Sequence, residues 1–266
     1  MFKKLFLSML LIFSAAGTCL ANNQNDILIN AAVNGTTRLV EKALANGANV
    51  NYTPPYRLSA LTIAVKNKKY EMVKVLLEHK ADPNLAVNNG FSSDTPLLYA
   101  IYNNDAKITE LLLQYGANPN QGRIIHGQIR VDVPQKTPGK PHPGKNKYDV
   151  TYEIYITPEM RGRGATPLIY AIQKDGNDSP SVEIVRLLLA NGADPNKTND
   201  YGYTPLMAAA DLQFISRKFM RLDIARLLLD NGADVQREDN YGNTALNFAS
   251  ATKFKEMADI LLPLVN

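Results

Sequence analysis

The amino-acid sequence predicts an all-α repeat solenoid, built from helix–turn–helix units with loop fingers, plus one inserted β-hairpin. Three observations predict it: a loop motif that recurs five times, a second motif that recurs as Thr-Pro-Leu or a close variant, and one segment in which apolar and polar residues alternate. Apolar residues make up 45% of the 266 residues, so a disordered chain is excluded. The expected order is a leader at 1–21, units one to three at 22–120, the insertion at 121–165 and units four to six at 166–266.

The first 21 residues have the pattern of a secretory signal peptide. Lys3 and Lys4 precede a 12-residue apolar run, and small residues follow it up to Ala21. The run is shorter than the ~20 residues of a spanning helix, so we expect an exported chain with no membrane span. The only cysteine, Cys19, lies in this leader and offers an alternative, in which the chain is a lipoprotein. We expect the periplasm as the destination, with full secretion as another alternative, and cleavage after Ala21 or earlier.

The loop motif is clearest as Asn-Gly-Ala-Asp-Pro-Asn at Asn191–Asn196. Four of the five copies follow a leucine-rich stretch that reads as a helix, and Asn-Gly after such a helix fits a left-handed C-terminal cap. Lys80 takes the glycine position in one copy, where a left-handed residue with a Cβ costs ~1 kcal/mol. The other four copies are Ala45–Asn51, His79–Asn84, Tyr115–Asn120 and Asn231–Gln236.

The second motif precedes each leucine-rich stretch and predicts the start of another helix. A Thr or Ser hydroxyl caps the helix, and Pro stands at the first helical position, where its missing N–H is harmless. Small residues one turn later let a neighbouring helix approach closely. One such unit cannot bury its apolar face alone, so the units must stack. The five cap residues are Ser59, Thr95, Thr166, Thr204 and Thr244.

On these motifs the chain resembles the ankyrin repeat, whose period is 33 and whose signature is Thr-Pro-Leu-His-x-Ala. Equivalent leucines at Leu28 and Leu61 are 33 residues apart, whereas Leu97 and Leu168 are 71 apart because the insertion lies between them. We expect six units, starting near Asn25, Tyr56, Asn88, Gly164, Asn199 and Asp239.

The resemblance implies an exported bacterial scaffold that binds a partner protein through a concave groove and loop fingers. It implies no catalysis and no cofactor, and we expect a monomer that binds no nucleic acid. One departure matters, because the family's His is replaced in every unit and its hydrogen bonds to the neighbouring loop are lost. We therefore expect a less regular stack of loops. The replacing residues are Thr62, Leu98, Ile169, Met207 and Asn247.

The insertion at 121–165 reads as a long β-hairpin. Residues 125–133 and 148–156 alternate apolar and polar side chains, and a Pro-, Gly- and Lys-rich loop that should be mobile joins them at Pro134–Lys147. The insertion carries a net +4, and the repeats carry −2. The hairpin either extends the loop sheet with a solvated tip, or acts as a recognition arm for an acidic partner. The candidate residues of the arm are Lys136, Lys140, Lys145 and Lys147.

The sequence holds no motif for phosphate binding, metalloprotease or nucleophilic chemistry. His126 and His142 lie near carboxylates in the insertion, but His142 lies in the expected mobile loop, and catalysis needs fixed geometry. We expect neither an enzyme nor a metal site. Aromatic residues at the loop tips instead suit protein recognition, although some could pack against neighbouring loops. These candidate contact residues are Tyr56, Phe91, Tyr201, Tyr203 and Tyr241.

Two alternative functions stay open at this point. One is a secreted virulence-type adaptor that acts on a host protein. Its mode of binding would be the same, and only the source of the partner protein would differ. The other is a protein whose basic arm binds anionic polymers of the cell envelope. Binding of a polyanion by the arm should fall steeply with salt, whereas recognition of a protein in the groove should fall less.

Overall fold

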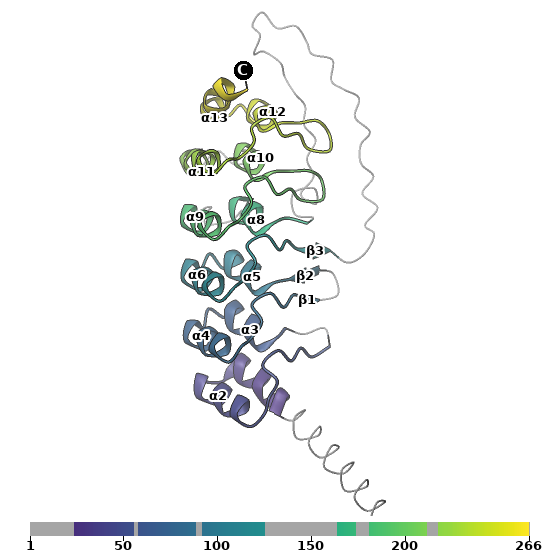
Figure 1. Ribbon diagram of the computed structural model, residues 1–266, viewed down its shortest axis with the longest axis vertical. Coiled ribbons are helices and arrows are strands. Elements are labelled where there is room, and N and C mark those ends of the chain that lie inside the picture. The colour runs from purple at the N-terminus through teal and green to yellow at the C-terminus, as the bar shows by residue number, and fades with distance from the viewer. Residues whose placement is uncertain are drawn as a thin grey trace, which may run out of the picture.

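The computed structural model describes residues 24–55, 58–88, 92–125, 164–173, 181–211 and 218–265 (Figure 1). Within these residues the chain forms six helix pairs stacked in chain order, as the repeat pattern predicts. The inner helices are residues 24–34, α3 (Ala60–Lys66), α5 (Pro96–Tyr102), α8 (Pro167–Gln173), α10 (Pro205–Ala210) and α12 (Ala245–Ala251). The outer helices are α2 (Thr37–Ala45), α4 (Tyr70–Glu78), α6 (Ala106–Gln114), α9 (Val182–Ala190), α11 (Lys218–Asp230) and α13 (Lys255–Leu261), followed by the 3-10 turn η2 (Leu262–Leu264).

Hydroxyl caps start five inner helices, as predicted. In each case the side-chain oxygen of the cap accepts a hydrogen bond from the backbone N–H three residues later, which satisfies one of the free donors of the first turn. Pro96, Pro167 and Pro205 each begin their helix directly after the cap. The five bonds are Thr62 N to Ser59 Oγ (3.2 Å), Leu98 N to Thr95 Oγ1 (3.3 Å), Ile169 N to Thr166 Oγ1 (3.2 Å), Met207 N to Thr204 Oγ1 (3.1 Å) and Asn247 N to Thr244 Oγ1 (3.4 Å).

Left-handed residues follow five outer helices. Glycine takes this position in four of them, with φ between 84° and 88° at Gly47, Gly116, Gly192 and Gly232. Lys80 takes it after α4 with φ 68°, which confirms the backbone strain predicted there.

The core lies between the two columns of helices. Outer helices contribute fully buried leucines such as Leu76, Leu112 and Leu188, and inner helices contribute buried alanines such as Ala64 and Ala100. Burying one leucine stabilises the fold by roughly 1.5–3 kcal/mol, and each unit obtains that burial from its neighbours. The insertion does not interrupt the stack, because α5 packs directly against α8 and α6 against α9.

Three short strands pair beside the inner helices of the third and fourth units. They are β1 (Val87–Asn88), β2 (Ser92–Asp94) and β3 (Ile124–Ile125), in the order β1-β2-β3 and antiparallel throughout. Only Ile125 of the two runs expected to form the inserted hairpin is described, and it belongs to β3. No such hairpin is seen in the described part of the chain, and the remainder of the insertion, from 126 to 163, lies outside it.

The expected leader also lies outside the described residues. Among the helices that are described, none combines the length and the apolar character that crossing a bilayer requires.

Candidate partner-binding surface

Asparagine side chains join each loop to the next one along the solenoid. The Oδ1 atom of an Asn near the end of one loop motif accepts from a backbone N–H of the following copy, and three of these residues also donate Nδ2 to a glycine carbonyl there. The loops that follow the outer helices are therefore stacked regularly, and for these loops our expectation of irregularity after loss of the family's His is wrong. The acceptor bonds are Asp82 N to Asn51 (2.8 Å), Asn118 N to Asn84 (2.7 Å), Asp194 N to Asn120 (2.8 Å) and Asp234 N to Asn196 (2.7 Å).

Asn199 and Asp239 shape the tips of the fingers that precede α10 and α12. Asn199 Oδ1 accepts from the backbone N–H of Tyr201 at 2.9 Å, and Asp239 Oδ1 accepts from that of Tyr241 at 2.9 Å. Gly202 follows in the left-handed region, with φ 74°, and a Cβ there would lie 2.7 Å from Asn240 Oδ1 of the next finger. Glycine at this position thus permits both the tight turn and the close approach of the two fingers.

Tyr201 and Tyr241 lie on these two neighbouring tips, each half-buried. Asn240 N, which precedes Tyr241, donates to the carbonyl of Tyr201 at 2.9 Å, so the tips are tied together. Burial, the nearby Tyr201 and the charge of Asp239 raise the pKa of Tyr241. Its hydroxyl is protonated at neutral pH, as the hydroxyl of an ordinary tyrosine is.

Tyr203 does not lie on the surface, so the expectation that it is exposed is wrong. Only 4% of it is exposed; its ring meets Phe248 edge to face at 5.2 Å and its hydroxyl donates to Asp211 Oδ2 at 3.0 Å. The physical reason is its place directly before the cap residue Thr204, where an apolar side chain packs against the helix start. Tyr203 therefore packs inward against the inner helix α12 of the next unit, and not against a neighbouring loop as the alternative interpretation had it.

The remaining candidate residues lie outside the described part of the chain. They are Tyr56, Phe91, Lys136, Lys140, Lys145 and Lys147.

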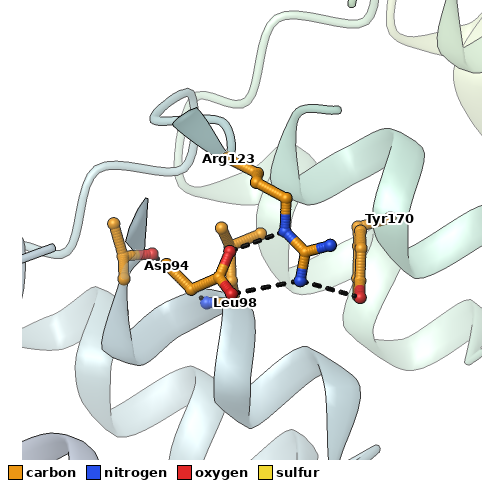
Figure 2. Close-up of polar contacts among 5 residues, drawn as sticks. Asp94, Leu98, Arg123 and Tyr170 are labelled. Carbon is orange, nitrogen blue, oxygen red and sulfur yellow. Dashed lines mark hydrogen bonds and ion pairs between the residues drawn. The ribbon is translucent and has the colours of Figure 1, made fainter. Parts of the chain in front are cut away.

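A polar cluster at the junction of units three and four was not predicted. Arg123 Nε lies 2.6 Å from Asp94 Oδ1, and Nη2 lies 3.1 Å from Oδ2 (Figure 2). Nη2 also donates to the hydroxyl of Tyr170 at 3.4 Å, and the guanidinium carbon lies 5.3 Å from the centre of that ring. Asp94 ends β2, Arg123 directly precedes β3 and Tyr170 lies on α8, so the cluster ties a finger to the inner helix of the next unit.

Two tyrosines of α5 extend this cluster along the inner helices. Tyr99 is half-buried, and Tyr102 is 62% exposed. Burial raises the pKa of both Tyr99 and Tyr170, and the charge of Asp94 raises them further. Arg123 lowers both values, but by less than burial raises them. We call Tyr99, Tyr102, Arg123 and Tyr170 the tyrosine patch.

A sequence signal for the patch existed. Tyr99 and Tyr170 each stand two residues after the leucine of Thr-Pro-Leu, and Tyr102 lies three residues further, on the same helix face as Tyr99. The sequence identifies Arg123 only as one of the basic residues of the insertion, whereas in the structure it contacts Tyr170 of the repeats. Its ion pair with Asp94 could not be predicted, because the two residues are 29 positions apart in the chain.

The described residues contain no group of three His, Cys, Asp or Glu side chains that could hold a metal ion. His126 and His142 lie outside them.

The stacked helix pairs and the ordered fingers define the class of the protein as a helical repeat scaffold. A family model described as "Ankyrin repeats (3 copies)" matches residues 4–87, 28–123, 145–239 and 180–266. These matches cover well over half of the sequence, so the chain belongs to the ankyrin-repeat family, a family of non-catalytic binding modules.

Relatives of similar sequence include ankyrin-repeat proteins of bacteria and viruses. The chain is 27% identical to the ankyrin repeat protein YahD of Escherichia coli (strain K12) over 190 residues, which are 69% of this chain and 88% of that protein. It is 37% identical over 100 residues to the ankyrin repeat protein FPV014 of fowlpox virus (strain NVSL), covering 37% of this chain but only 22% of the viral protein.

Solved structures share the fold. An ankyrin repeat domain from Acinetobacter baumannii AYE is 26% identical, with a TM-score of 0.63 over 88% of this chain and 95% of that domain. A chain in the complex of the predatory endopeptidase Bd0816 from Bdellovibrio bacteriovorus with the immunity protein Bd3460 is 22% identical, with a TM-score of 0.60 over 89% of this chain and 97% of that one. At that identity the likeness concerns the fold alone.

Proposed function

We propose that this chain is an exported ankyrin-repeat scaffold that binds a partner protein through its concave groove, its fingers and an inserted arm. The observation that carries the proposal is the tie between adjacent fingertips, which holds Tyr201 and Tyr241 side by side on the surface. Ankyrin repeats typically bind proteins, and one chain of the same fold occurs in a complex of an endopeptidase with its immunity protein.

The rigidity of the fingers supports this proposal. Asn bonds between loops and Asx-type bonds within the tips fix the backbone before any ligand arrives. A surface that is already ordered loses little conformational entropy on binding, and tyrosine side chains have few torsions to fix. The fingers are therefore suited to recognition of a folded partner.

Export and the arm are proposed on the sequence. The leader has the pattern of a signal peptide, and the insertion carries a net +4 on a chain whose repeats are slightly acidic. We place the protein in the periplasm and assign the arm an acidic partner surface. The second candidate function is binding of anionic envelope polymers. The positive charge of the insertion also favours this function, because four lysines fall within Pro134–Lys147.

Crosslinking in the native envelope fraction tests the fingers. We expect the wild-type protein to crosslink to a defined partner, and a Tyr201→Ala/Tyr241→Ala double variant to lose most of that product. Tyr70→Ala is the matched control, because Tyr70 is an exposed tyrosine on the outer helix α4. If the double variant and the control capture the same proteins equally, the proposed finger site is wrong.

Deletion of Pro134–Lys147 tests the arm. We expect weaker partner capture with an unchanged melting temperature. Equal capture would make this loop a spacer. A third result would favour the polymer-binding function. In that case capture falls steeply between low and high salt but persists in the tyrosine variant.

A further inference from the structure

The tyrosine patch presents aromatic surface that the solenoid itself leaves open. Tyr102 ends α5 with 62% of its surface exposed, although it belongs to an inner helix packed on both sides by other inner helices. Tyr99 and Tyr170 are half-buried and occupy equivalent positions on the adjacent helices α5 and α8. A tyrosine surface of this kind gives a ligand contact area and hydrogen bonds with little loss of entropy.

The charges of the patch are already paired with each other. Arg123 and Asp94 form two hydrogen bonds, and their side chains are 29% and 7% exposed. A ligand carboxylate or ammonium would lose its water here without meeting an uncompensated opposite charge, which is unfavourable. The electrostatics of the patch therefore favour an uncharged ligand group.

One hydrogen-bond donor of the patch remains available to a ligand. Arg123 uses Nε and Nη2 for Asp94 and Tyr170, as Figure 2 shows, while Nη1 has no acceptor among the described residues and is not one of their buried atoms. The hydroxyls of Tyr99 and Tyr170 are protonated at neutral pH, because burial raises a pKa that is already about 10 in an ordinary tyrosine.

An available donor in a patch whose charges are paired matches a carbonyl group of a peptide backbone. We propose that the tyrosine patch binds an extended, uncharged segment of the partner protein, with a backbone carbonyl accepting from Arg123 Nη1 and an apolar side chain packed on Tyr102. This inference rests on the proposed function and names the part of the inner-helix face that the partner contacts. It needs neither the fingertip tyrosines nor the basic arm.

The test uses random peptides displayed on phage, selected on the full protein and then synthesised for affinity measurement. We expect the selected sequences to be uncharged and to share an apolar residue. Tyr102→Ala should weaken their binding about tenfold, as loss of a central aromatic contact does. Tyr70→Ala should leave it unchanged. Between about 0.05 and 0.5 M NaCl the affinity should change less than about threefold, because no charge pair forms on binding.

Several outcomes would overturn the inference. These are enrichment of acidic or basic peptides, no enrichment at all, and binding that Tyr102→Ala does not weaken. Self-association that Tyr102→Ala abolishes would assign the patch to a second copy of this chain, which also overturns it. Peptides lost on Tyr201→Ala/Tyr241→Ala but not on Tyr102→Ala would leave the proposed function standing while this site fails. Peptide binding at the patch without any envelope crosslink would leave this site standing while the proposed finger site fails.

Arg123→Lys gives a second and finer readout. Lysine keeps the positive charge beside Asp94 but has no equivalent of the planar Nη1 donor. We expect the affinity for the peptide to fall about fivefold, because the variant loses the hydrogen bond from Arg123 Nη1 and such a bond has a modest net strength. Tyr102 remains in place in this variant. The melting temperature of this variant separates loss of a ligand contact from loss of the fold, and unchanged affinity in a folded variant would exclude Arg123 as a donor to the ligand.

Discussion

At the scale of single residues, Lys80 is a strained position at which the other repeats have glycine. Its φ of 68° lies in the left-handed region, where the equivalent residues are Gly47, Gly116, Gly192 and Gly232. Lys80 is exposed, so its side chain contributes little packing that would be lost on replacement.

Lys80→Gly should therefore stabilise the protein. Relief of the left-handed strain contributes ~1 kcal/mol or more, and the greater freedom of glycine in the unfolded chain offsets part of it, which leaves a gain of roughly 0.5 kcal/mol. Urea unfolding measures the difference. Lys74→Gly, at an exposed position inside α4, is the matched control and should lose about 1 kcal/mol. A loss in both variants would show that Lys80 is not strained.

The half-buried phenols of Tyr99 and Tyr170 predict how stability depends on alkaline pH. Burial, the larger cause, together with Asp94, raises the pKa of Tyr99 and Tyr170 in the folded chain, so the folded state favours their protonated forms. The resulting contribution to stability is complete below the unfolded pKa of about 10 and is lost as the pH rises through the folded values.

We expect the urea midpoint to fall as the pH rises above about 10, and to fall less in Tyr99→Phe. Tyr102→Phe changes an exposed tyrosine of the same helix and serves as the control. A midpoint that falls equally in all three proteins would mean that Tyr99 does not contribute to the alkaline loss.

At the scale of elements, local chemistry explains what the sequence could predict. Caps such as Thr95 and Thr204, and the left-handed position at Lys80, act within one turn of a helix, so their motifs predict both ends of the helices correctly. Features that depend on tertiary packing could not be predicted in this way. Tyr203 has the spacing of a fingertip residue but turns inward to Phe248, and β1 and β2 are too short to have a periodic pattern.

The ion pair of Arg123 and Asp94 connects elements that the chain separates. It joins the end of β2 to the start of β3 beside α8, and Tyr170 covers the guanidinium. We expect this clamp to keep the finger of unit three aligned with the inner helix of unit four.

A double-mutant cycle with Asp94→Asn and Arg123→Gln measures the clamp. The coupling free energy should be about 1–2 kcal/mol, above the range of exposed ion pairs because Asp94 is buried and below that of fully buried ones because Arg123 is partly exposed. The cycle also cancels the effect of other contacts made by either residue. Coupling below about 0.3 kcal/mol would place this pair with ordinary surface ion pairs.

At the scale of the whole molecule, the solenoid is continuous across the insertion. Asn120 binds Asp194 N and Gly192 O at 2.8 Å each, the same bonds that join other neighbouring units, although these residues lie more than 70 positions apart. Arg123 N donates to the carbonyl of Ala165 at 3.1 Å, so the chain leaves and re-enters the stack at adjacent points. The repeats therefore do not need the insertion to hold their register.

Replacing residues 126–163 with a short Gly-Ser linker should leave the fold intact. Because the two ends already lie together, shortening the loop about tenfold lowers the entropic cost of closing it by roughly 2 kcal/mol, and the variant should be at least as stable as the parent. Circular dichroism and urea unfolding would show an unchanged helix content and one cooperative transition. Two separate transitions, or a clear loss of stability, would mean that the insertion contributes packing that joins units one to three to units four to six. An intact fold would leave the insertion free to act as the arm of the proposed function, since no part of the repeats depends on it.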